Sequence, residues 1–270
     1  MLRWLQSLRN NVDYPIRQFI RWRRGARSAM PESKAEAFQR FDDGVRTQTT
    51  IEAQKIIERF KLNSLLESCS LRDYTTNLYY LAMMEEAFQL EEAELPNRLL
   101  VADVGTGSWN YAPALHNFLM CWGSPEPRNL EIHGFEIDAY RVFNDLRSRF
   151  DHAEGYLSSL SGLQFRPTPF RTAPDQYDLI TMFFPFVFPG DHLSWGLPKK
   201  LFRPEILLRA VWESLKGDGI LFIANQGAEE FEEQKRLASM VGIKGMRSIP
   251  FASRFHDYEI PRFVHIVQKK

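Results

Sequence analysis

The chain has 270 residues, enough for one large domain or two small ones, and 44% of its residues are hydrophobic. Charged residues make up 25%, and 34 Lys and Arg balance 34 Asp and Glu, so the formal net charge is zero. This composition excludes collagen-like, intrinsically disordered and disulfide-rich chains, and the balanced charge gives no general electrostatic reason to bind nucleic acid or membranes.

The two cysteines, Cys69 and Cys121, stand in none of the short spacings that bind zinc or form redox pairs. No stretch reaches the roughly 18 apolar residues that a membrane-spanning helix needs. Arginines interrupt the apolar residues of the N-terminus, where a signal peptide would have its core. We therefore expect a soluble, cytoplasmic protein without a metal site.

Residues 1–30 are strongly basic, with seven arginines against a single acid, Asp13. Apolar residues recur there at helical spacing, and Pro15 is expected to split the segment into two helices. We favour a helical element that packs on the domain and keeps its arginines in solvent. The alternative is a basic amphipathic element that contacts an anionic membrane or RNA.

The next part of the chain is predicted to be helical. Capping-box patterns predict helices that begin near residues 34 and 50, and a third helix is expected over about 73–92, before Pro96. No strand is expected here, so residues 1–95 are predicted to form an N-terminal helical extension or cap.

From residue 98 onward, apolar strands alternate with helices, which is typical of a doubly wound sheet. The expected strands cover 99–104, 129–137, 163–170, 177–186, 219–225, 246–254 and 262–268, and the expected helices cover 111–121, 139–150, 204–215 and 231–240. The last two strands are expected to pair as an antiparallel hairpin at the edge of the sheet. The predicted fold is therefore α/β, with a mostly parallel seven-stranded sheet, an antiparallel C-terminal edge hairpin and a preceding helical segment.

A glycine-rich loop follows the first of these strands and contains Gly105, Thr106 and Gly107. Glycines at such a place let the chain turn tightly and let a ligand approach the main chain. A dinucleotide-binding fingerprint would need a further glycine at Asn110, so that pattern fails. With Asp103 two residues before its first glycine, the loop resembles motif I of the class I S-adenosylmethionine-dependent methyltransferases, acid-x-Gly-x-Gly-x-Gly.

The resemblance covers about residues 98–270 and implies a Rossmann-like methyltransferase domain over 96–270. Glu136 ends the second strand, in the place of the family's ribose-binding acid, and one carboxylate can accept hydrogen bonds from both ribose hydroxyls. The resemblance implies that the S-adenosyl-L-methionine site is formed by Asp103, Gly105, Thr106, Gly107, Trp109, Glu136, Ile137 and Phe183.

The sequence departs from the family at three places. Trp109 stands where a third glycine is common, and it either shapes the methionine end of the pocket or packs beneath the loop as core. The segment around Thr168 lacks the acid that often binds the adenine amino group, so contacts there would rest on the backbone or on Thr168. Phe183 replaces the polar residue of enzymes that methylate nucleobase amino groups, which disfavours that chemistry. Because aromatic faces attract cations such as a sulfonium, the candidate pocket walls are Trp109, Tyr111, Phe183 and Phe184.

Residues 187–198 are expected to form a long loop at the carboxyl ends of the strands, where ligands bind in such sheets. Within it, Asp191 and His192 are candidates for a catalytic base and its orienting partner, or are ordinary surface residues. Methyl transfer from a sulfonium can proceed mainly by positioning, so no base is required.

Together these features predict an S-adenosyl-L-methionine-dependent methyltransferase of an unidentified acceptor, with a small molecule favoured. Two alternatives stay open, because a fold does not fix a function. The first is a non-catalytic Rossmann-like binding or scaffold protein with a degraded cofactor site. The second is an RNA-associated methyltransferase that uses the basic N-terminus.

Overall fold

The computed structural model describes residues 2–28, 30–256 and 258–270. Its centre is a seven-stranded sheet with the strand order β3-β2-β1-β4-β5-β7-β6. The strands are β1 (Arg98–Val104), β2 (Asn129–Phe135), β3 (Leu163–Arg166), β4 (Tyr177–Phe183), β5 (Leu215–Gln226), β6 (Arg247–Phe251) and β7 (Arg262–Gln268). The first five run parallel, and β7 runs antiparallel to both β5 and β6. The predicted fold class is confirmed.

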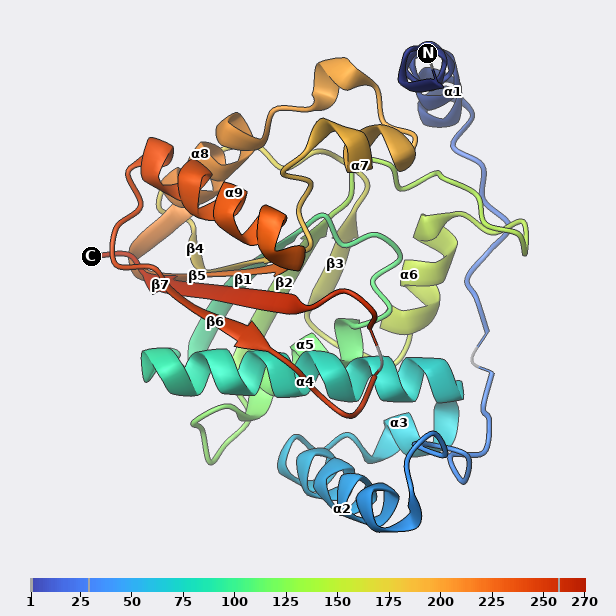
Figure 1. Ribbon diagram of the computed structural model, residues 1–270, viewed down its shortest axis with the longest axis vertical. Helices are drawn as coiled ribbons and strands as arrows, with labels where there is room; N and C mark the ends of the chain where they lie inside the picture. Colours follow the sequence, from blue (N-terminus) through green and yellow to red (C-terminus); the bar gives the residue numbers. More distant parts are fainter. Residues whose placement is uncertain (1, 29, 257) are drawn as a thin grey trace.

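Helices cover both faces of the sheet (Figure 1). One face carries α4 (Leu71–Glu91), α5 (Ala112–Cys121) and α6 (Arg149–Leu157), and the other carries α8 (Pro204–Ser214) and α9 (Gly227–Val241). Alternate side chains of β1 enter the two layers, with Val101 in one hydrophobic cluster and Ala102 in the other. The first cluster also contains residues from 38–93, so α4 shares its core with the sheet. The predicted division of the chain at residue 95 stays a prediction.

The helices α2 (Asp43–Arg59) and α3 (Asn63–Ser68) lie outside α4, at the lower end of the molecule in Figure 1. The prediction of helices beginning near 34 and 50 is wrong. Residues near 34 form turns, and α2 begins earlier because the Asp42 side chain accepts a hydrogen bond from the backbone N–H of Val45 at 2.9 Å. The Thr49 hydroxyl therefore lies inside the helix and donates to the carbonyl of Val45 instead of capping.

The first helix, α1 (Leu2–Ile20), lies at the opposite end of the molecule from α2, and the connecting chain runs along one edge (Figure 1). The predicted break at Pro15 is wrong, since Pro15 lies inside one continuous helix. Proline lacks a backbone N–H, so the carbonyl four residues earlier loses one helical hydrogen bond. Because Pro15 is exposed, water can bind that carbonyl instead. The connecting chain is fastened by Arg27, whose backbone N–H donates to the carbonyl of Asp151 at 2.9 Å.

Two further predicted elements differ. The expected helix over 139–150 is an irregular segment, because Ser148 and Asp151 form a capping box that begins α6 only at Arg149. The expected loop over 187–198 contains a short helix, α7 (Pro189–Ser194), before a turn of 3₁₀ helix at Lys199–Leu201. None of the helices in the described ranges combines the length and apolarity needed to cross a membrane.

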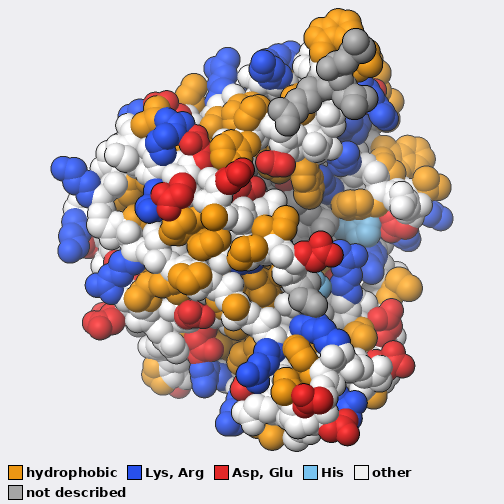
Figure 2. All heavy atoms as spheres, in the orientation of Figure 1, with side chains coloured by type: hydrophobic (Ala, Val, Ile, Leu, Met, Phe, Trp, Pro, Cys, Tyr) orange, Lys and Arg blue, Asp and Glu red, His pale blue; other side chains and the backbone are white. Residues whose placement is uncertain are grey.

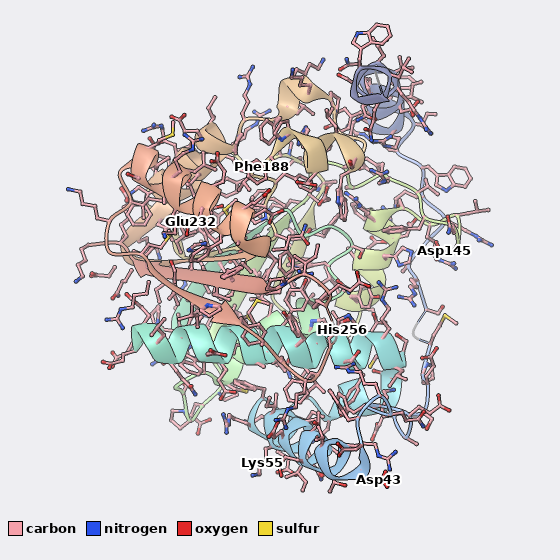
Figure 3. The ribbon with its side chains drawn as sticks, in the orientation of Figure 1. Asp43, Lys55, Asp145, Phe188, Glu232 and His256 are labelled. Atoms are coloured by element: carbon pink, nitrogen blue, oxygen red, sulfur yellow. The ribbon has the colours of Figure 1, made fainter. Side chains whose placement is uncertain are left out.

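The segment between β6 and β7 folds over the beginning of α4. Figure 3 shows His256 of this segment beside α4. The ring centres of Tyr258 and Tyr79 are 4.8 Å apart, and those of His256 and Tyr258 are 4.4 Å apart. These ring contacts fasten the segment to α4.

Candidate functional site

The glycine loop leaves β1 at the carboxyl edge of the parallel strands. Gly105 (φ +85°) and Gly107 (φ +60°) both have the left-handed conformation that glycine adopts without strain. A Cβ atom added at either glycine would meet nothing within 4 Å, so there is open space in front of both. The backbone N–H of Gly105 donates to the carbonyl of Phe135 at 2.8 Å, which fastens the loop to the end of β2.

Asp103 lies beneath this loop and has no exposed surface. One carboxylate oxygen accepts from Trp109 Nε1 at 2.7 Å and from the Tyr111 hydroxyl at 2.8 Å, and the other accepts from the Thr181 hydroxyl at 2.7 Å. Burial raises the pKa of the Asp103 carboxyl to about 6, although these three hydrogen bonds lower it. Through these three protein donors, Asp103 holds the loop from below.

Trp109 is fully buried and packs against the sheet under Gly134, whose added Cβ would lie 2.5 Å from the indole. Of the two alternatives for this side chain, the structure places it in the core. Phe183 is also buried, and its ring centre lies 4.7 Å from the ring centre of Tyr111. Among the four candidate pocket walls, Phe184 is the one that is partly exposed, and the Arg262 guanidinium lies 5.0 Å from its ring centre.

Glu136 lies next to the glycine loop, where the resemblance put it. Its Oε2 accepts from the backbone N–H of Gly107 at 2.7 Å, and its Oε1 accepts from the backbone N–H of Asp138 at 2.7 Å and from Arg149 at 3.1 Å. A carboxylate has about four acceptor positions, so these three bonds leave room for a further donor on Oε2. Sequence reasoning missed Arg149, although the Ser148–Asp151 capping pattern could have placed it at the start of α6.

The two residues after Glu136 are covered by α1, which sequence reasoning did not foresee. The carbonyl of Ile137 accepts from the Tyr14 hydroxyl at 3.2 Å and from Gln18 Nε2 at 3.1 Å. Arg17 binds the fully buried carboxylate of Asp138 through two hydrogen bonds of 3.1 and 3.0 Å. The N-terminal helix thus lies over the carboxyl end of β2, beside the expected ribose position.

The two candidate catalytic residues do not form a pair. His192 is buried in α7, its Nε2 lies 2.9 Å from the carbonyl oxygen of Pro198, and burial lowers the pKa of its imidazole. Asp191 is half-buried, and no hydrogen bond joins it to His192 in the described parts of the chain. Thr168, the candidate for adenine contact, is exposed beyond the end of β3. The hydrogen bond between His192 and the carbonyl of Pro198 fixes the turn after α7.

The hydrogen-bonding groups and the open space at the loop fit S-adenosylmethionine. The space in front of Gly105 and Gly107 is open, and Glu136 retains an acceptor position for a ribose hydroxyl. The Thr106 hydroxyl is buried without a hydrogen-bond partner, which leaves a polar group for a ligand. Within the described ranges, no cluster of three or more His, Cys, Asp or Glu side chains could hold a metal ion.

The order of the strands, the reversed edge strand β7 and the glycine loop against Glu136 define a class I methyltransferase fold. No protein-family model and no curated protein matches the chain.

Among solved structures, the chain is similar to a SAM-dependent methyltransferase from Aquifex aeolicus, at 18% identity over 80% of this chain and 97% of that one, with a TM-score of 0.46. It is also similar to the CurJ carbon methyltransferase, at 12% identity over 72% of this chain and 55% of that one, with a TM-score of 0.48. The [4+2]-cyclase SpnF aligns at 11% identity over 70% of this chain and 81% of that one, with a TM-score of 0.47. At these identities the likeness concerns the fold.

Two buried groups give the stability of this protein opposite dependences on pH. The folded pKa of Asp103, about 6, is above its ordinary value of 3.8, so between these values the folded state binds more protons and stability falls as pH rises. Burial, and to a lesser extent Lys235, lowers the pKa of His265 from 6.5 to about 4, so there the unfolded state binds more protons and stability rises with pH. Each effect amounts to about 3 kcal/mol at ~1.4 kcal/mol per pH unit.

Because the two effects offset each other between pH 4 and 6, we expect single substitutions to separate them. Asp103→Asn should make the free energy of unfolding rise more steeply with pH than in the unsubstituted protein, and His265→Phe should make it fall. Urea unfolding followed by circular dichroism at several pH values measures both slopes. Parallel curves for all three proteins would contradict the assigned protonation states.

Proposed function

We propose that the protein is an S-adenosylmethionine-dependent methyltransferase that acts on a small molecule. The observation that carries the proposal is the 2.7 Å hydrogen bond from the Gly107 N–H to Glu136. It brings together two motifs that lie far apart in the sequence, beside open space at the carboxyl edge of the sheet. Ligands bind at this edge in open α/β sheets.

When bound, the cofactor supplies a methyl group on a positively charged sulfur for transfer to a nucleophile. The chain's own residues would bind and orient it: Glu136 accepts from the ribose, and the main chain at Gly105 and Gly107 allows close approach of the methionine part. Because its ring is partly exposed, we infer that Phe184 contributes to the acceptor side. Because His192 is bonded to Pro198, we assign no base, and the proposed catalysis rests on proximity and exclusion of water.

Calorimetric titration with S-adenosylmethionine and S-adenosylhomocysteine tests this proposal. We expect binding to the unsubstituted protein and a loss of about 10- to 100-fold for Glu136→Gln, since hydrogen bonds to a charged group contribute about 1.5–3 kcal/mol. Glu230→Gln is a matched control, because Glu230 is also a buried carboxylate that accepts a backbone N–H, from Gln226 at 2.9 Å, at the end of β5.

Folded protein that gives neither heat nor a thermal shift with either ligand would refute the methyltransferase proposal. Equal losses for Glu136→Gln and Glu230→Gln would refute the role of Glu136 in ribose binding.

One observation favours the second candidate, a non-catalytic binding or scaffold protein. Arg149 already binds Glu136 at 3.1 Å, and both side chains are buried, so their ion pair competes with a ribose hydroxyl for Oε1. Adding Arg149→Gln to the titration separates the two candidates. A degraded cofactor site predicts that the ligands bind only after this substitution, whereas the methyltransferase proposal requires binding to the unsubstituted protein.

A further inference from the structure

We propose that α1 docks the protein on an anionic lipid bilayer, with its apolar face lying in the membrane interface. This interaction surface is independent of the proposed methyltransferase activity. It rests on the orientation of α1, on the apolar residues beside it and on the arginines at its edges.

The helix is held to the domain by its polar face. Asn10 is buried and donates to the carbonyls of Leu193 and Leu197 at 2.8 and 3.1 Å. One turn further along the helix Tyr14 binds the carbonyl of Ile137, and two turns further Arg17 binds Asp138. Residues three, four and seven positions apart lie on one side of a helix, so these three side chains form one stripe that faces the domain. Polar contacts therefore determine how α1 is oriented.

The opposite face of α1 is apolar and faces outward. Phe19 is 88% exposed and Ile20 is 60% exposed, and the other exposed apolar side chains of this helix are Trp4, Leu5, Leu8, Val12 and Ile16. In Figure 2, hydrophobic side chains are visible at the end of the molecule that carries α1. A helix that packed on the domain for hydrophobic burial would have the reverse orientation. This arrangement leaves a continuous apolar surface, which marks an interaction site.

The apolar surface continues past the end of the helix. The indole N–H of Trp22 donates to the carbonyl of Leu146 at 2.9 Å, which holds Trp22 against the tip of the segment 139–148. That tip carries three further exposed apolar side chains, those of Val142, Phe143 and Leu146. Figure 3 shows Asp145 of this tip at the outer edge of the molecule. Tryptophan at the boundary of an apolar surface is typical of segments that lie at a membrane interface.

Positive charge lies at one end of this surface. Arg21 and Arg24 are exposed, and within the described ranges their guanidinium groups bond to backbone carbonyls, of Gln18 and Asp145, and to no carboxylate. Arg9 is also exposed, although it pairs with Asp13. The carboxylate of Asp145 is paired as well, with His152 at 3.2 Å and Arg147 at 3.7 Å. The unneutralised charge is therefore cationic, and it complements anionic lipid headgroups.

These features favour lipid over other occupants. A contact between two copies of α1 would offer Arg21 and Arg24 no anionic partner from the helix itself, because its single acid, Asp13, is paired with Arg9. RNA binding uses arginines with aromatic rings for stacking, and it gives no role to the aliphatic stripe of Leu5, Leu8, Val12 and Ile16.

Flotation with lipid vesicles tests the proposal on the full chain. The vesicles consist of phosphatidylcholine alone or of equal parts phosphatidylcholine and phosphatidylglycerol. We expect flotation with the anionic vesicles, a decrease with added salt, and a blue shift of tryptophan fluorescence on binding. The double variant Phe19→Ser/Ile20→Ser should bind at least tenfold more weakly. Ile206→Ser on α8 is the matched control, because Ile206 is 59% exposed, as Ile20 is at 60%, and it should bind normally.

Three outcomes would overturn the proposal. The first is the absence of flotation with anionic vesicles while near-ultraviolet circular dichroism shows folded protein. The second is a dimer in solution that Phe19→Ser/Ile20→Ser disrupts, without vesicle binding, which would identify a second copy as the occupant. The third is binding to an oligouridylate that this double variant leaves unchanged, again without vesicle binding, which would identify the segment as an RNA-binding arm.

Discussion

Trp109→Ala is expected to lower the free energy of unfolding by about 3–5 kcal/mol, as for other large aromatic side chains truncated in a core. The indole is fully buried, packs against Gly134 and donates from Nε1 to Asp103 at 2.7 Å. Its removal leaves a cavity directly under the glycine loop and takes away one of the three donors to Asp103. Urea unfolding of the variant measures the loss.

The same contact can be tested from the other side. A methyl group at position 134 would stand 2.5 Å from the indole, so Gly134→Ala is expected to cost about 1–3 kcal/mol through overpacking. Gly217→Ala is the matched control, since Gly217 is also in a strand and its added Cβ would meet nothing within 4 Å.

The double variant Gly134→Ala/Trp109→Leu should lose less stability than the sum of the two single variants, because the smaller side chain makes room for the methyl group. Additive losses would show that Trp109 and Gly134 are not in contact and would place the indole elsewhere, including in the ligand pocket.

The sheet and the meeting of the two motifs could be predicted because they follow from local patterns. Strands buried on both faces are continuous apolar runs, and β1 and β4 are nearly so. In a parallel pair the carboxyl ends lie together, and the pairing of Val104 with Phe135 brings the glycine loop next to Glu136. Alternation of strands and helices was therefore enough to predict which ends would form the candidate site.

The environment of the site depends on side chains that are far apart in the sequence, and no local pattern reports them. Arg17 reaches Asp138 across 121 residues, and Thr181 reaches Asp103 across 78. The outward apolar face of α1 could not be predicted either, because hydrophobic periodicity indicates that a face is buried but does not identify what buries it. Here the buried polar partner, Asp138, lies in a different part of the fold.

Two of the wrong predictions, the helix starts near 34 and 50 and the helix over 139–150, involve a capping choice. Thr49 and Ser33 match the capping pattern, but Asp42 caps α2 and Ser148 caps α6. Short polar side chains satisfy backbone groups in turns as well as at helix starts. The Ser33 side chain does the former, since it accepts from the backbone N–H of Ala35 at 3.2 Å.

Asp103→Ala is expected to cost about 3–5 kcal/mol, since a buried donor left without a partner costs about 1–3 kcal/mol and this carboxylate serves three. Asp103→Asn keeps one carbonyl acceptor and should cost less. Asp178→Ala is a suitable control, because Asp178 accepts from the Leu100 N–H at 2.8 Å and from Lys216 Nζ at 2.8 Å but lies away from the site and partly in solvent.

These variants also distinguish support of the loop from contact with a ligand. If Asp103 only holds the loop, Asp103→Asn should weaken S-adenosylhomocysteine binding in proportion to its loss of stability, and Trp109→Phe, which removes one of the same hydrogen bonds, should do so as well. If Asp103→Asn leaves the stability unchanged but abolishes S-adenosylhomocysteine binding, the Asp103 carboxylate contacts the ligand directly. Its three protein donors, each within 2.8 Å, favour the supporting role.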